Sequence, residues 1–218
     1  MKQKTLFATT LAFLLLAFAV GAFFYQAQQE KPGAQRADID QSALLRMHSP
    51  SLGKADAPVV IVEFLDPACE TCSAFYPRIK QMMAANPEQI RLVLRYAPFH
   101  NGSDKIVAML EAARKQDKFW PALEALLATQ ADWSPHHTPQ AMLAWKHLAG
   151  LGLDMERLAL DMTSPDIAAI IEQDLADART LNVTKTPEFF VNGKPLPSWG
   201  YEQLQTLVNT ELAKAKRR

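Results

Sequence analysis

A nearly continuous apolar run, residues 57–65, leads within four residues to the only two cysteines of the chain, Cys69 and Cys72. The run is rich in β-branched residues, which predicts a buried central strand. Residues 71–85 then carry apolar side chains at helical spacing, so a helix is expected to start at the cysteine pair. The two thiols should therefore share one face at a helix N-terminus, close enough to form a disulfide.

A disulfide between Cys69 and Cys72 would close a very short loop. Such a loop removes little entropy from the unfolded chain, so the bridge would be a weak structural crosslink. A thiolate at Cys69 would gain from the unpaired N–H groups and positive dipole of the helix start, which lower a cysteine pKa. The pair therefore predicts a redox-active dithiol that needs no other cofactor. Structural zinc is disfavoured because it needs four ligands and the chain has no second cysteine pair.

The pattern after the first helix predicts a βαβ unit followed by a long helical region. Residues 90–96 form an apolar run that is typical of a second strand. The region of about residues 103–181 then shows helical periodicity and helix-start signals. The helices in it are expected to begin at Ser103, Phe119, Thr138-Pro139 and Ser164-Pro165.

After residue 183 the chain returns to strands. Residues 186–191 and 194–196 are predicted strands, and Asn192-Gly193 between them is a two-residue hairpin signal. Residues 201–215 follow as an amphipathic helix. The whole order is βαβ, a helical block, then ββα, which places the chain in the α/β class.

The N-terminal 40 residues differ from the rest in composition. Residues 6–25 lack charge and follow two lysines, so residues 1–25 predict a signal anchor that spans the membrane. The alternative is a signal peptide cleaved near Ala22. Residues 26–40 are polar and predict a tether, which leaves residues 41–218 as the folded domain. The lysines should stay in the cytoplasm and place that domain in the bacterial periplasm, an oxidising compartment.

The charge composition argues against nucleic acid as a partner. The chain has 23 basic and 23 acidic residues, so its formal net charge is zero. No overall field therefore favours nucleic acid. The polar segment before the domain is also too short for a dimerisation module, so a monomer is expected.

The order of the predicted elements resembles the thioredoxin fold, and the long helical block is similar to that of DsbA-like thiol-disulfide oxidoreductases. The resemblance covers about residues 51–215. The motifs that carry it are VEFLDPACETC, RYAPFH at the end of the second strand, KFW in the helical block and TPEFFVNGK. It implies a central mixed sheet flanked by helices, with an inserted helical subdomain. It also implies disulfide exchange with cysteine-containing exported proteins and a membrane redox partner that recycles the dithiol.

The resemblance also assigns roles to individual residues. Cys69 matches the nucleophile and Cys72 the buried resolving cysteine. Pro187 matches a cis-proline which, with Thr186, presents backbone to a substrate strand. Glu63 matches a buried acid that moves a proton to or from the resolving cysteine. The alternatives are a Glu63 carboxylate paired with a surface arginine and an ordinary trans proline at Pro187.

The dipeptide between the cysteines departs from the strongest oxidants of the family, which resemble Cys-Pro-His-Cys. Here it is Glu70-Thr71. The Glu70 charge is expected to raise the pKa of Cys69 by repulsion, and the Thr71 hydroxyl to offset part of that rise. The pair is then expected to act as a moderate oxidase or as a reductase or isomerase, since the fold does not choose the direction.

Two other functions use the same residues. Cys69 and Cys72 could bind Cu(I), a soft metal, with His100, His136 or His137 completing the site. His136 and His137 fall in a predicted loop, which favours a solvated pair. A non-catalytic peptide-binding or chaperone module would keep the fold, but the intact cysteine pair and Thr-Pro motif argue against it.

Overall fold

The computed structural model describes residues 18, 20–21 and 41–217. The chain divides into two units, Met1–Asp38 and Ile39–Arg218, and the second holds the cysteine pair. The predicted anchor and tether fall almost wholly outside the described residues. Among the described residues, no helix combines the length and apolar character needed to cross a membrane.

Five strands form one mixed sheet in the order β1-β3-β2-β4-β5. They are β1 Ser51–Leu52, β2 Val59–Leu65, β3 Ile90–Tyr96, β4 Glu188–Val191 and β5 Lys194–Pro195. β2 and β3 are parallel and the other neighbouring pairs are antiparallel. This sheet confirms the predicted fold class. The sequence did not reveal β1, because two residues are too few to show a period.

The central strand β2 is covered on both faces, which explains its unbroken apolar sequence. Because side chains alternate along a strand, Ile61 and Leu65 enter one core while Val62 and Phe64 enter the other. The first core also contains both cysteines. Glu63 shares the face of Ile61 and Leu65, so its carboxyl group enters the cysteine-containing core.

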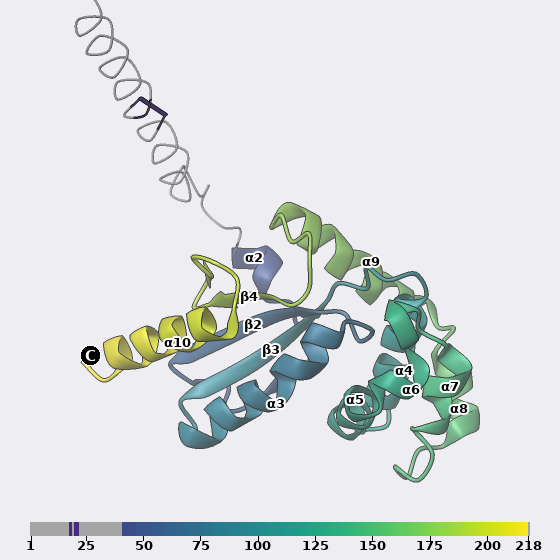
Figure 1. Cartoon of the computed structure of the whole chain (residues 1–218). Helices are drawn as coiled ribbons and strands as arrows, with labels where there is room; N and C mark the ends of the chain where they lie inside the picture. Colours follow the sequence, from purple (N-terminus) through teal and green to yellow (C-terminus); the bar gives the residue numbers. More distant parts are fainter. Residues whose placement is uncertain (1–17, 19, 22–40, 218) are drawn as a thin grey trace, which may run out of the picture. The chain divides into compact units, whose positions relative to one another are not determined.

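The helices cover both faces of the sheet and form the insertion (Figure 1). They are α2 Gln41–Leu44, α3 Glu70–Ala85, α4 Ser103–Arg114, α5 Phe119–Ala128, α6 Gln130–Trp133, α7 Ala141–Lys146, α8 Met155–Asp161, α9 Pro165–Thr180 and α10 Tyr201–Ala215, with a short 3₁₀ helix at Pro135–His137. The predicted start at Thr138-Pro139 is wrong by two to three residues. Thr138 is not helical, and its hydroxyl donates to the His136 carbonyl instead of capping a helix.

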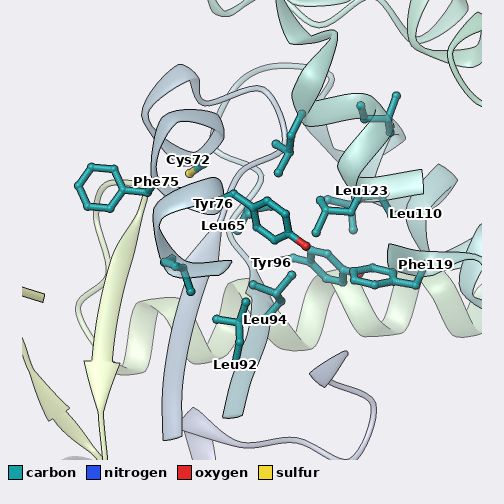
Figure 2. Packing of buried hydrophobic residues seen from close by; sticks show 14 of the residues in the cluster. Leu65, Cys72, Phe75, Tyr76, Leu92, Leu94, Tyr96, Leu110, Phe119 and Leu123 are labelled. Carbon is teal, nitrogen blue, oxygen red and sulfur yellow. The ribbon is translucent and has the colours of Figure 1, made fainter. Parts of the chain in front are cut away.

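The inserted helices share the core of the sheet. Helices α4 to α8 gather in one group beside the sheet in Figure 1, and α4 packs against α5, α7, α8 and α9. Figure 2 shows how Tyr96 of β3 links Leu92 and Leu94 of the sheet to Leu110 and Phe119 of the insertion. The tyrosine hydroxyl donates to the buried Glu111 carboxylate of α4 over 2.6 Å. The insertion is therefore packed directly against the strands that carry the cysteine loop.

An ionic cluster lies on the face of the sheet that is turned away from the cysteine-containing core. Arg95 of β3 is fully buried and donates to Asp174 over 2.7 Å and to Asp177 of α9 over 2.5 Å. Arg46 and His48, which follow α2, contact the same two carboxylates. A buried guanidinium requires paired carboxylates, so this cluster explains how Arg95 can be buried in the strand. It also holds the start of the domain against α9.

The hairpin is built as predicted from Asn192-Gly193. Both residues have positive φ, 48° and 76°, which is the geometry of a type I′ turn. The Asn192 side chain also accepts from Val60 N and donates to Pro58 O, so the turn is bonded to the start of β2. The hairpin thereby places β4, and the residues just before it, beside the central strand.

Candidate active site

The cysteine pair lies at the start of α3, at the carboxyl end of the parallel strands. Cys69 is the N-cap residue, and its sulfur accepts a hydrogen bond from the Cys72 backbone N–H over 3.4 Å. Both side chains are free thiols in this structure. Cys72 has no exposed surface and Cys69 is 6% exposed. The pair is thus held on one helix face, with Cys69 the more accessible sulfur.

The surroundings lower the pKa of Cys69 to about 5. The largest cause is a hydrogen bond from the Cys72 thiol, which outweighs the opposing effect of burial. The Thr186 side chain and the backbone amides of Cys72 and Thr71 lower the pKa further. Helix-terminal amides therefore act here as the sequence predicted.

Glu70 is not among the groups with the largest influence on the pKa of Cys69. Its side chain is exposed to solvent. Solvent screens a charge in this position, whereas the hydrogen bonds at the Cys69 sulfur are direct. Thr71 lowers the pKa of Cys69 through its backbone amide.

Cys72 shows the opposite behaviour. Burial raises the pKa of its thiol well above the ordinary value, and the hydrogen bond that it makes to Cys69 raises the pKa further. The carboxyl group of Glu63 adds to this effect. The reduced pair is therefore one thiolate and one thiol at neutral pH, which separates the attacking sulfur from the protected one.

We expect iodoacetamide to modify Cys69 rapidly at about pH 6 and Cys72 only after unfolding, because only Cys69 is a thiolate in the folded chain. The ultraviolet absorbance of the thiolate should titrate with a midpoint near 5. Thr186→Val, which removes one donor, should raise that midpoint. A midpoint in the range of a free thiol, about 8.5, would contradict the assigned ionisation.

Glu63 lies in β2 beside Leu94 of β3 and Phe189 of β4, with no exposed surface. Neither carboxyl oxygen has a hydrogen-bond partner among the described residues. The alternative of a carboxylate paired with arginine is therefore wrong. Burial, with a smaller contribution from the Cys69 charge, raises the pKa of Glu63 to about 8. The group is thus mostly protonated at neutral pH and holds a proton beneath the cysteine pair.

The Thr186–Pro187 peptide bond is cis, and the trans alternative is wrong. The Thr186 carbonyl oxygen lies 3.3 Å from the Cys69 sulfur and accepts from the thiol. Trp199, which no motif in the sequence marks as a site residue, donates through Nε1 to the Pro187 carbonyl over 3.1 Å. Its ring packs on Phe75 of α3 and remains 44% exposed. Trp199 lies in a loop and belongs to no helical or strand repeat, so the sequence could not predict this contact.

The loop between β2 and α3 is held by Asp66, for which the sequence alone indicated no role. Its buried carboxylate accepts from the Ala68 N–H over 2.9 Å and from the Ser103 hydroxyl. It also accepts from the backbone and ring nitrogens of His100, over 2.9 and 2.7 Å. His100 therefore joins the RYAPFH segment to the cysteine loop.

The histidines do not complete a Cu(I) site with the cysteines. His100 is bonded to Asp66, and its ring stacks on His137 with centroids 5.1 Å apart. His136 and His137 are exposed, as the loop interpretation predicted. Over the described part of the chain, no group of three or more His, Cys, Asp or Glu side chains is placed to hold a metal ion.

Gln130, the first residue of α6, is a further contact that the sequence did not indicate. Its side-chain amide donates to the Pro67 carbonyl over 2.6 Å and to the Cys69 carbonyl over 3.0 Å. A glutamine in a polar stretch carries no sign of such a partner, since the contact spans more than sixty residues of sequence. Only the packing of the insertion against the sheet creates it.

Comparison with known proteins agrees with this geometry. The family described as thioredoxin matches residues 46–210. The Na(+)/H(+) antiporter NhaA of Herminiimonas arsenicoxydans is 29% identical over 84% of this chain, but the chain spans only 29% of the antiporter's length. Disulfide bond formation protein D of Bacillus subtilis (strain 168) is 26% identical over 75% of this chain and 77% of its own.

A solved structure extends the agreement from sequence to fold. The thioredoxin-like oxidoreductase from Silicibacter pomeroyi DSS-3 superposes with a TM-score of 0.68 and is 27% identical. The match covers 82% of this chain and 99% of that one. It therefore includes the inserted helices as well as the sheet. With its Cys-x-x-Cys pair and this fold, the chain belongs to the thioredoxin family.

Proposed function

We propose that the chain introduces disulfides into cysteine-containing exported proteins through the Cys69–Cys72 pair. The observation that carries this direction is the lowered pKa of Cys69 beside the raised pKa of Cys72. Stabilising the Cys69 thiolate stabilises the dithiol relative to the disulfide, so the disulfide form becomes a better oxidant. Disulfide bond formation protein D of B. subtilis, a relative by sequence, is consistent with that direction.

The exchange begins with the oxidised pair. A substrate thiolate attacks the Cys69 sulfur, the Cys69–Cys72 bond breaks, and Cys72 leaves as a thiolate. A second substrate thiolate then attacks the substrate sulfur of the mixed disulfide and releases Cys69 as a thiolate. The substrate loses two electrons and gains a disulfide, while the pair accepts both electrons.

The ionisation of the site matches these two steps. Cys69 is the better leaving group because hydrogen bonds stabilise its thiolate. Cys72 must take up a proton because burial disfavours its charge. Glu63, which is mostly protonated at neutral pH, can supply that proton. The chain thus assigns one sulfur to the substrate and the other to the protein interior.

Substrate positioning and recycling follow from the same proposal. The Thr186 carbonyl lies against the Cys69 sulfur, and Thr186 and Pro187 would offer backbone to an extended substrate segment. A membrane redox partner would reoxidise the pair after each turnover. The chain would act as a monomer in the bacterial periplasm, held at the inner membrane by residues 6–25.

The equilibrium between the full chain and glutathione tests this direction. We expect a reversible dithiol–disulfide transition with a reduction potential between about −180 and −120 mV, the range of protein oxidants. A value near that of thioredoxin, about −270 mV, would instead indicate a reductase or an isomerase kept reduced. Absence of a reversible transition would overturn the oxidoreductase proposal altogether.

A further inference from the structure

The inserted helices make polar contacts with α3 and with the loop before it, in addition to sharing its hydrophobic core. Ser73 Oγ donates to the Leu127 carbonyl of α5 over 2.8 Å. The Tyr76 hydroxyl donates to the Glu124 carboxylate over 3.1 Å. Both contacts hold the body of α3. Gln130 is different, because it bonds the loop that carries Cys69 and not the helix behind it.

The Gln130 side chain is aimed at two carbonyl oxygens of that loop. It is 5% exposed, and its Nε2 donates to Pro67 O over 2.6 Å and to Cys69 O over 3.0 Å. An amide nitrogen has two hydrogens, so both bonds can exist at once. A buried polar side chain with both donors used in this way fixes the position of the backbone that it bonds.

The same loop is held from its other side by Asp66. The Asp66 carboxylate accepts from Ala68 N and its backbone carbonyl accepts from Cys69 N over 3.0 Å. The loop's backbone N–H groups are thus bonded to Asp66, directly after β2, while its carbonyl groups are bonded to Gln130 of the insertion. The Cys69 carbonyl also accepts the first bond of α3, from Ser73 N. Each polar contact restricts the position of the residue that carries the reactive sulfur.

We propose that Gln130 is a positioning residue for Cys69, through which the inserted helices set the reactivity of the dithiol. The inference rests on the function proposed above and extends it to a residue outside the cysteine motif. The bond that the Cys72 N–H donates to the Cys69 sulfur stabilises the thiolate. It is directional and 3.4 Å long, so a small movement of the loop weakens it. Without the amide of Gln130, the two carbonyls lose a shared donor and the loop is held from one side only.

Gln130→Met in the full chain tests the proposal, since methionine keeps the length of the side chain but donates no hydrogen bond. Gln116→Met is the matched control, because Gln116 lies in the same insertion but bonds the backbone of Asp154. The readouts are the thiolate titration of Cys69, the equilibrium constant with glutathione and the midpoint of thermal unfolding. The first two report on the sulfur, and the third on folding alone.

We expect Gln130→Met to raise the titration midpoint of Cys69 and to favour the disulfide in the glutathione equilibrium by about fivefold to tenfold, the effect of one hydrogen bond. Gln116→Met should leave both sulfur readouts within about twofold of the unsubstituted chain. If Gln130→Met does not fold, Gln130→Asn retracts the amide by one methylene and should shift the same two readouts in the same direction.

Two results separate failure of this inference from failure of the proposed function. If the unsubstituted chain exchanges with glutathione and the Gln130 variants change only thermal unfolding, Gln130 is structural and the inference is overturned. If the unsubstituted chain shows no exchange, the proposed function fails. The Cys69 titration then still decides whether Gln130 positions the sulfur, since it requires no exchange reaction.

Discussion

Cys69→Ser is expected to lower the rate of disulfide exchange by at least about a thousandfold, because no other sulfur of the chain is both accessible and ionised. A serine hydroxyl neither forms a disulfide nor ionises at neutral pH. The loss should therefore appear in the reaction with glutathione and with a reduced, unfolded protein substrate. Thermal unfolding should change little, since serine can still accept at the N-cap position.

Cys72→Ser separates the two sulfurs. The Cys69 thiolate of this variant should still attack a disulfide, but no second thiol is present to resolve the product. Mixed disulfides with Cys69 are therefore expected to accumulate, and mass spectrometry of the full chain measures them. Equal accumulation in Cys69→Ser and Cys72→Ser would contradict the assignment of Cys69 as the sulfur that meets the substrate.

Glu63→Gln is expected to make the reduced chain more stable than the unsubstituted protein at neutral and mildly alkaline pH. The folded chain binds a proton at Glu63 up to about pH 8, whereas the unfolded chain releases it near 4.5. Between these values the native state holds the additional proton, so the stability of the unsubstituted chain falls as pH rises. A glutamine is neutral throughout and removes this dependence.

The size of this stability difference follows from the gap between the pKa of Glu63 in the folded chain and its pKa in the unfolded chain. The difference in unfolding free energy should grow by up to about 1.4 kcal/mol per pH unit from about pH 4.5, reach a few kcal/mol, and level off above about pH 8. Urea unfolding of the reduced chain at several pH values measures it. The lowered pKa of Cys69 acts in the opposite direction, which is why both chains are compared in one redox state.

Glu111→Gln is the control for the substitution itself. Glu111 is also fully buried, but its carboxylate accepts from Tyr96 and Arg114. Removing a paired buried carboxylate should lower stability, by about 1–3 kcal/mol, rather than raise it. If Glu63→Gln instead behaves like Glu111→Gln at all pH values, Glu63 has a partner and the proton reservoir beneath the cysteines does not exist.

The sequence by itself determined the order of the elements and the place of the dithiol. The apolar run before Cys69 predicted the central strand, β3 and α10 have the predicted bounds, and α5 begins at the predicted residue, Phe119. These features are local, because a period of 2 or 3.6 and a turn signal such as Asn192-Gly193 depend on neighbours in the chain. The helix start at Cys69 was readable for the same reason.

The tertiary structure alone decided how the site is tuned. Glu70, adjacent in sequence, is exposed, whereas Thr186 and Gln130, each more than sixty residues from Cys69, contact it directly. The ionisation of Glu63 likewise depends on which groups surround a buried carboxyl. Hydrogen bonding and desolvation act over a few ångströms in space, so they follow the packing of the sheet, the cis-proline loop and the insertion. The identity of the residue next to Cys69 in the sequence therefore does not predict the pKa of its thiol.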